Sequence, residues 1–268
     1  MAYIRSAGSV TNPRRRFRRT TGVAWWSTMS DRAQSDVLGF VFVFAIVVAT
    51  IGLVFSTGFA GLQDARDFER VNNAQRAFEV LKDNVEDVVA RGAPSRATEI
   101  KLADASLAFG QPVTINVSEK NGSFSTSQEI DPLVYDANTG TEIVYSAGAI
   151  VRQQDNGEIV AHPPGFVLTA ERTVIPIIQT RDSGAGSVSG DTTVLIRTTV
   201  AQRNVLYASE GESTLWVNVT TPRANAWHDH LDDRDHVTCE PVAGDDVACQ
   251  VETRRVYITR ISIDTELD

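Results

Sequence analysis

The pattern of hydrophobic and polar residues divides the chain into three stretches. The first, residues 37–62, contains no charged side chain. A helix of about 26 residues rises roughly 39 Å, which exceeds the ~30 Å hydrocarbon core of a membrane. The pattern therefore predicts a membrane-spanning helix at 37–62. We expect the mature protein to keep this helix, because the run is not at the extreme N-terminus and no Ala-x-Ala cleavage site follows it.

The second stretch, residues 63–91, has the period of an amphipathic helix. Its apolar residues recur at intervals of three and four and so fall on one face, with acidic residues between them. Gly92 and Pro94 suit a cap and a stop. We expect one helix from about residue 35 to 91, whose stripe packs either on the chain's own C-terminal domain or on helices of neighbouring subunits. The stripe consists of Val71, Ala74, Phe78, Leu81, Val85 and Val88.

The third stretch, from residue 97 onward, consists of short runs rich in Val, Ile, Thr and aromatic residues, separated by Gly, Asn, Asp and Ser. This pattern predicts an antiparallel β domain. One helix is expected at 223–232, with Pro222 in its first turn after a Thr cap. The fold class is therefore α+β, with the long N-terminal helix packed on a β-rich C-terminal domain. The expected strands are 98–102, 112–117, 142–146, 166–169, 173–178, 192–201, 204–207, 214–219 and 255–263.

The chain is acidic, with 25 Lys and Arg residues against 34 Asp and Glu residues. Residues 1–33 hold seven arginines and one acid, which leaves 18 basic and 33 acidic groups, a net charge of −15, in residues 34–268. A surface with many acids and few lysines is typical of proteins from concentrated salt, although ordinary acidic drift gives the same balance. The acidity argues against a nucleic-acid partner.

The first 28 residues admit two interpretations. Arg14–Arg19 has the Arg-Arg-x-Phe pattern of a twin-arginine signal, but the segment after it is too short and polar for an export signal. The simpler interpretation is that the natural chain begins at Met29 and that 1–28 is an upstream extension with no role. If 1–28 is present, its arginines hold the N-terminus in the cytoplasm; from Met29, charge alone gives no orientation.

The residues just before the apolar run carry the sharpest functional signal. The segment DRAQSD at 31–36, followed by an unbroken apolar helix, resembles the class III signal peptide of archaeal type IV pilin-like proteins. The QSDVLGF-type start is most similar to haloarchaeal pilin-like or archaellin-like surface proteins. The resemblance departs from bacterial type IV pilins at Leu38, since those proteins carry Glu at the fifth mature residue.

The resemblance implies a processing site and a topology. A prepilin peptidase would cut between Ala33 and Gln34, with Arg32 as the preceding basic residue, so the apolar helix would remain. The chain would then comprise a leader (1–33), a long helix (34–92) and an extracellular β domain (93–268). It would be a single-pass cell-membrane protein whose helix assembles with like or related pilin subunits.

Two cysteines and three sequons carry further expectations. Nine residues with turn-forming types separate Cys239 from Cys249, which favours a disulfide across a hairpin worth roughly 2–3 kcal/mol. Two buried thiols or metal ligands are the alternatives. Asn116, Asn121 and Asn218 each begin an Asn-x-Ser/Thr sequon and are candidates for glycosylation if the domain lies outside the cell. Asn121, in an expected turn, is the best candidate.

The remaining candidate chemistry is a cluster of histidines and acids at 228–236. His228 and Asp232 are spaced to share a cation on a helix, but the segment matches no metal-binding spacing and contains Arg234. An acidic, solvated helix end explains it better. The sequence has no phosphate loop and no Gly-x-Ser-x-Gly or His-Glu-x-x-His motif. We therefore predict no enzyme, no catalytic residue, no cofactor and no metal.

These observations rank three functions. The first is a pilin-like subunit of an archaeal surface filament or secretion or adhesion apparatus, processed by prepilin peptidase and assembled through its N-terminal helix. The second is a single-span surface-binding protein that never polymerises. The third is an anchored enzyme with the histidine cluster as its site.

Overall fold

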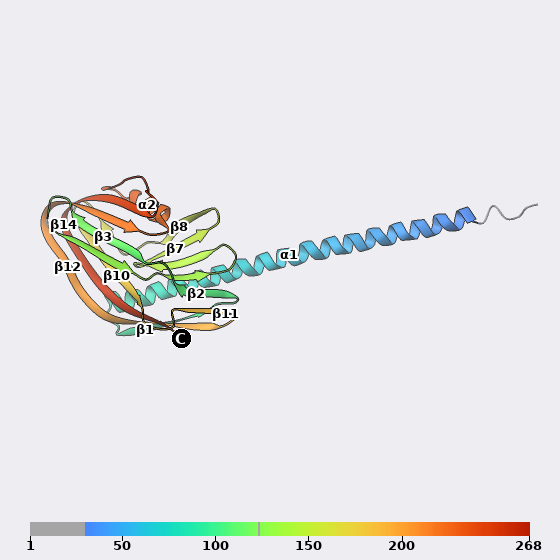
Figure 1. Cartoon of the computed structure of the whole chain (residues 1–268), viewed down its shortest axis with the longest axis horizontal. Coiled ribbons are helices and arrows are strands. Elements are labelled where there is room, and N and C mark those ends of the chain that lie inside the picture. Colours follow the sequence, from blue (N-terminus) through green and yellow to red (C-terminus); the bar gives the residue numbers. More distant parts are fainter. Residues whose placement is uncertain (1–29, 123) are drawn as a thin grey trace, which may run out of the picture. The chain divides into compact units, whose positions relative to one another are not determined.

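The structure is a computed structural model that describes residues 30–122 and 124–268, with side chains described from Val37 onward. The chain divides into two compact units between Ala60 and Gly61. One helix, α1 (Ser30–Ala90), runs through this boundary, and the second unit adds the β-rich domain (Figure 1).

Helix α1 ends within one residue of its predicted end. Gly92 has φ +77°, in the left-handed region that glycine adopts at little cost. The amide of Ala93 donates to the carbonyl oxygen of Asp87 at 3.2 Å, so the residue after Gly92 satisfies a carbonyl of the last turns of the helix. The predicted glycine cap is confirmed, and α1 stops one residue before the expected end at 91.

The apolar stripe of α1 packs on the chain's own β domain, the first of its two expected partners. Its six side chains are each at most 5% exposed, and the five from Val71 to Val85 belong to one core cluster with the strands around them. Phe78 contacts Tyr135 edge to face, with ring centroids 6.5 Å apart. The long helix packed on a β-rich domain, as the α+β class predicts, is confirmed.

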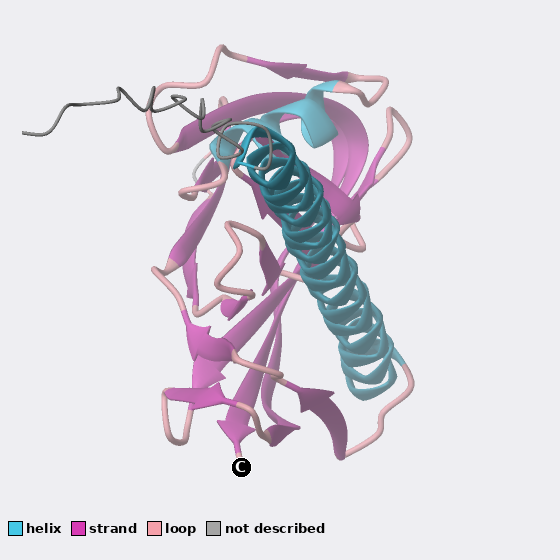
Figure 2. Cartoon of the chain, turned by 90° about the vertical axis from the view of Figure 1, so that its right-hand side faces the viewer, coloured by secondary structure: helices cyan, strands magenta, loops and turns pink. Residues whose placement is uncertain are grey.

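The strands of the described residues form two sheets (Figure 2). The first has the order β4-β3-β12-β14-β10-β9, with β1 also paired to β12 and β13 to β14. The second has the order β11-β2-β5-β6-β7-β8. The strands are β1 (Ser95–Lys101), β2 (Ala105–Phe109), β3 (Val113–Glu119), β4 (Ser125–Ile130), β5 (Leu133–Asp136), β6 (Glu142–Ser146), β7 (Ala149–Gln154), β8 (Gly157–His162), β9 (Val167–Leu168), β10 (Thr173–Asp182), β11 (Ser187–Gly190), β12 (Thr193–Thr220), β13 (Val237–Cys239) and β14 (Asp246–Leu267).

Strand β12 corrects the sequence prediction, which divided its length into three strands. Its ladder with β14 continues through polar residues at register shifts between Val200 and Gln202, between Val205 and Tyr207, and after Glu210. Bulges accommodate extra residues in one strand without ending the pairing. The sequence prediction also missed β2, β4, β5, β7, β8, β11 and β13 altogether, and it placed the start of β14 too late.

One strand pair departs from the antiparallel expectation. Strands β10 and β14 pair in parallel from Thr173 to Asp182, whereas the other pairs of the described strands are antiparallel. A parallel pair needs a long connection. Here the chain passes through β11, β12, α2 and β13 before β14 begins.

Helix α2 (Ala224–Asp232) begins one residue later than predicted, after Arg223 at the N-cap. No side chain caps it, and Pro222 lies outside the helix, so the predicted Thr cap and first-turn proline are wrong. Thr221 instead accepts a hydrogen bond from the Arg223 amide at 3.3 Å. The buried face of α2 places Trp227 in the second core cluster, with β3, β12 and β14.

Candidate functional site

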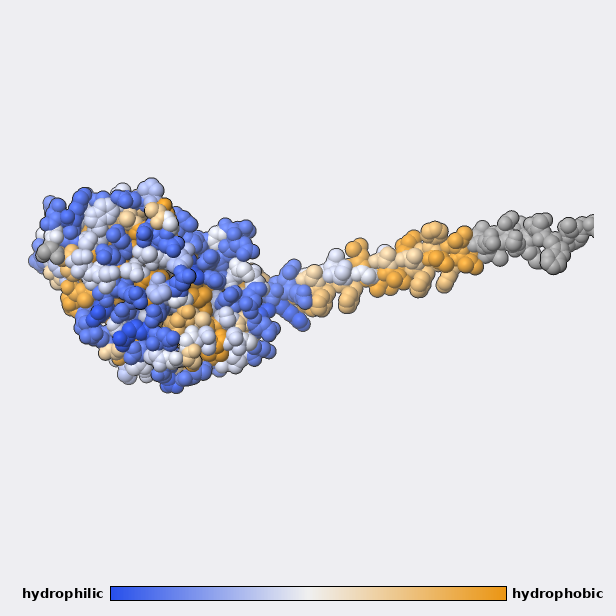
Figure 3. All heavy atoms as spheres, viewed as in Figure 1, coloured by the Kyte–Doolittle hydropathy of each residue, from blue (hydrophilic) through white to orange (hydrophobic). Residues whose placement is uncertain are grey.

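The apolar first half of α1 is the candidate site, because the described chain leaves its large apolar side chains exposed. Those in 37–62 are between 48% and 73% exposed. By length and composition α1 could cross a membrane, and Figure 3 shows the apolar run in orange. The exposed apolar residues are Val37, Leu38, Phe40, Val41, Phe42, Val43, Phe44, Ile46, Val47, Val48, Ile51, Leu53, Val54, Phe55, Phe59 and Leu62.

The few polar side chains in this half are satisfied by the helix itself. The Thr50 hydroxyl donates to the carbonyl oxygen of Val47 at 2.8 Å, and the Thr57 hydroxyl donates to that of Leu53 at 2.9 Å. The Ser56 hydroxyl also donates to the Leu53 carbonyl, at 3.0 Å. Hydroxyls bonded to their own helix expose no unpaired donor to lipid. The segment is therefore chemically suited to an apolar surrounding on every side.

The predicted processing residues Arg32, Ala33 and Gln34 lie in α1 by backbone, but their side chains fall outside the described residues. The 1–28 extension also lies outside them. Cleavage between Ala33 and Gln34 stays a prediction.

Polar contacts fix the end of α1 to the β domain. The Arg203 guanidinium donates to the carbonyl oxygen of Val89 at 2.8 Å and also to that of Val88. These carbonyl groups belong to the last turn of α1, where carbonyl oxygens have no N–H partner within the helix. A cation at this end also complements the helix dipole. One turn earlier, the Asn84 amide donates to the Thr98 hydroxyl at 2.9 Å. The second half of α1 is thus held by polar contacts as well as by its stripe.

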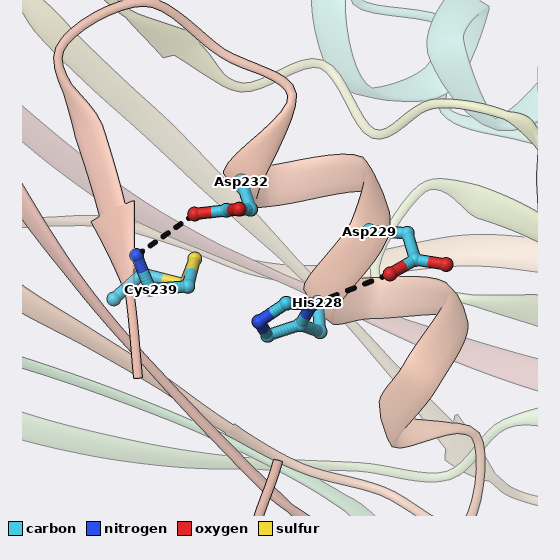
Figure 4. The surroundings of a disulfide bond; sticks show 5 residues. His228, Asp229, Asp232 and Cys239 are labelled. Atoms are coloured by element: carbon cyan, nitrogen blue, oxygen red, sulfur yellow. Dashed lines mark hydrogen bonds and ion pairs between the residues drawn. A yellow bond between two sulfur atoms is a disulfide. The ribbon is translucent and has the colours of Figure 1, made fainter. Parts of the chain in front are cut away.

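Cys239 and Cys249 form the expected disulfide, with an S–S distance of 2.01 Å (Figure 4). They are register partners on the antiparallel pair β13 and β14, and Cys249 is fully buried. The Cys239 amide donates to Asp232 Oδ1 at 3.1 Å. The disulfide and this bond tie the end of α2 to the sheet.

The histidine cluster does not converge on one point. His228 Nδ1 lies 3.3 Å from Asp229 Oδ1, whereas Asp232 is turned to the Cys239 amide (Figure 4). Burial, together with the Arg234 cation, lowers the pKa of His230, although Asp233 opposes this. Over 37–122 and 124–268, no three His, Cys, Asp or Glu side chains are placed to hold a metal ion. This arrangement suits the end of a solvated helix.

The three sequon asparagines lie in two settings. Asn121 is exposed in the turn between β3 and β4, while Asn116 and Asn218 lie on strands β3 and β12. The register places Asn116 directly opposite Asn218. No sequence signal predicts this pairing, because about a hundred residues separate the two positions. Glycosylation stays a prediction at all three.

These features define a β-rich domain joined by one helix to an exposed apolar segment that could span a membrane. The chain belongs to the family described as "Family of unknown function (DUF7289)", whose model matches residues 32–266. No curated protein and no solved structure matches the chain.

Proposed function

We propose that this chain is a membrane-anchored, pilin-like subunit of an archaeal cell-surface filament or secretion or adhesion apparatus. The observation that carries the proposal is the contrast within α1. Its second half buries its apolar stripe on the chain's own domain, while its first half is apolar on all sides and remains exposed. Such a segment needs lipid, the helices of other subunits, or first one and then the other.

Processing by a prepilin peptidase follows from the DRAQSD segment before the helix. Cleavage after Ala33 would remove Arg32 from the end of a helix that must pack among apolar neighbours, where an unpaired charge is costly. The family match begins at Arg32, so the six arginines before it lie outside the shared region. This supports a chain whose working part starts near the proposed cleavage site.

An extracellular β domain is the topology that we propose. Disulfides persist in oxidising surroundings and are rare in the cytosol, so the Cys239–Cys249 bond favours the outer side. The acidic balance of residues 34–268 suits a surface that faces concentrated salt.

Mass spectrometry of the mature N-terminus tests the processing step. The full chain, expressed in a haloarchaeal host with an active prepilin peptidase, is expected to begin at Gln34. A host that lacks the peptidase is the matched control and should yield a chain that retains Arg32. Retention of Arg32 in the active host would remove the basis for the proposed processing.

A second candidate is a single-span surface-binding protein that does not polymerise. The burial of the stripe on the chain's own domain favours it, because that stripe is then not offered to neighbouring subunits.

Both native cysteines are in a disulfide, so one added cysteine reports contacts between copies. Val48→Cys should crosslink in membranes if the apolar helices bundle, whereas Ile159→Cys, exposed on the β domain, is the control. Absence of crosslinking at Val48 favours the second candidate.

A further inference from the structure

The side of the first sheet that faces away from the core carries an aromatic side chain and several amide side chains. Packing of the core does not explain these residues. Along β3, β12 and β14, alternate side chains enter the core, and those between them face away from it. In register, Ser118, Trp216 and Gln250 form one row across the three strands, and Asn116, Asn218 and Ala248 form the next. We call these six residues the Trp216 face.

The Trp216 face is uncharged, although residues 34–268 carry a net charge of −15. The rows continue outward through Ser125 and Ser127 on β4 and Thr238 on β13, which are also neutral. Charges appear at the rim, where Lys120 Nζ donates to Gln250 Oε1 at 3.1 Å. Across the five strands this neutral band extends roughly 19 Å at ~4.8 Å per strand.

Three side chains of this face lack a hydrogen-bond partner among the described residues. Within the described residues, the amides of Asn116 and Asn218 and the indole N–H of Trp216 make no hydrogen bond, and Asn218 Oδ1 is buried without one. Buried polar atoms are normally paired, so an unpaired one calls for an explanation. Trp216 itself is half-buried, with an apolar ring beside these unpaired amides.

We propose that the Trp216 face binds an uncharged polysaccharide. A sugar ring offers C–H groups on its faces and hydroxyls around its edge. The Trp216 ring supplies a rigid, flat apolar surface against which the C–H groups can pack. The two asparagines, with Gln250 and Ser118, supply hydrogen-bond donors and acceptors for the hydroxyls. An acidic polymer is disfavoured by the charge of the domain. A protein partner is disfavoured because the face has no cluster of large apolar side chains.

The competing occupant is a glycan attached to the chain itself. Asn116 and Asn218 each begin a sequon, and Ser118 and Thr220, which complete the two sequons, lie on the same side of the sheet. Substitution of both asparagines by glutamine removes the sequons but keeps the amides. This variant therefore separates binding of an external polysaccharide from attachment of a glycan.

Affinity electrophoresis of the detergent-solubilised full chain through gels that contain dextran, mannan or galactan tests the proposal. We expect retardation by at least one of these neutral polymers, unchanged by added salt. Trp216→Ala and Asn218→Asp should weaken binding roughly tenfold or more, as expected at an aromatic contact and at an amide that becomes charged. Tyr257→Ala, an exposed aromatic outside this face, is the matched control and should bind normally.

The Asn116→Gln/Asn218→Gln chain should still bind, and Trp216→Phe keeps the test valid if Trp216→Ala fails to fold, since it retains a flat ring. Retardation by none of the three polymers overturns the proposal, as does equal loss in Tyr257→Ala. A glycan found by mass spectrometry on Asn116 or Asn218 overturns it too, because the face is then occupied by the chain's own modification. The outcome does not depend on whether the chain assembles into a filament.

Discussion

The two halves of α1 share one backbone conformation but differ in where their apolar side chains lie. In the second half, Phe78 and Val85 are fully buried in a core cluster with the chain's own strands. In the first half, Val47 is 48% exposed and Phe55 is 73% exposed. The difference comes from periodicity. A stripe on one face can be covered by one domain, whereas a helix that is apolar on every face needs an apolar medium around it.

The largest expected effect comes from the buried half. Phe78→Ala should lower the free energy of unfolding by about 3–5 kcal/mol, because it removes a fully buried ring and leaves a cavity. Val80→Ala is the matched control on the same helix. Val80 is 51% exposed, and its loss should change stability by less than about 0.5 kcal/mol. Denaturant titration of the full chain in detergent, followed by tryptophan fluorescence, measures both. Equal effects would show that the stripe is not packed as described.

A charge placed in the apolar half of α1 tests whether that half anchors the chain in a membrane. Val48→Arg places a cation within the exposed apolar segment and should cost about 3 kcal/mol of insertion, roughly a hundredfold in partitioning. The same change in the second half, at exposed Asn73, should have no such effect. Alkaline extraction of membranes, with the chain quantified in both fractions, provides the measurement. If both variants stay equally in the membrane, the apolar half is not the anchor.

Periodicity explains what could be predicted from sequence. The six stripe positions, the helix end at Gly92 and the apolar run follow from spacing along one element, so local patterns suffice for them. The continuity of β12 does not follow from local patterns. Gln202 and Arg203 look like loop residues unless the bulges that accommodate them are known. Likewise, the parallel pairing of β10 with β14 depends on contacts far apart in sequence.

The candidate site divides in the same way. The apolar segment and the Cys239–Cys249 pair follow from composition and a short loop, and the structure contains both. The Trp216 face could not be predicted, because β3 and β12 lie about a hundred residues apart and only their register places Asn116 opposite Asn218.

The disulfide provides a perturbation confined to the β domain. Cys239→Ala with Cys249→Ala should lower the free energy of unfolding by about 2–3 kcal/mol, since it frees a short loop of the unfolded chain. Membrane partitioning should not change, because the apolar half is untouched. Denaturant titration and alkaline extraction of one preparation test both statements. Reduction of the unaltered chain should reproduce the loss of stability, and a simultaneous loss of membrane partitioning would contradict the separation of the two roles.

The smallest expected effect concerns the last turn of α1. Arg203→Ala removes the guanidinium that donates to the carbonyl oxygens of Val88 and Val89 and should lower stability by about 1 kcal/mol. Arg203→Lys keeps the charge near the helix end but loses the two-pronged geometry, so it should recover part of that loss. Hydrogen exchange should increase most at the amides of the last turn and remain unchanged around Phe78. Uniform exchange along the second half would mean that the stripe and the cap unfold together, and that Arg203 supports the whole packed half rather than its end.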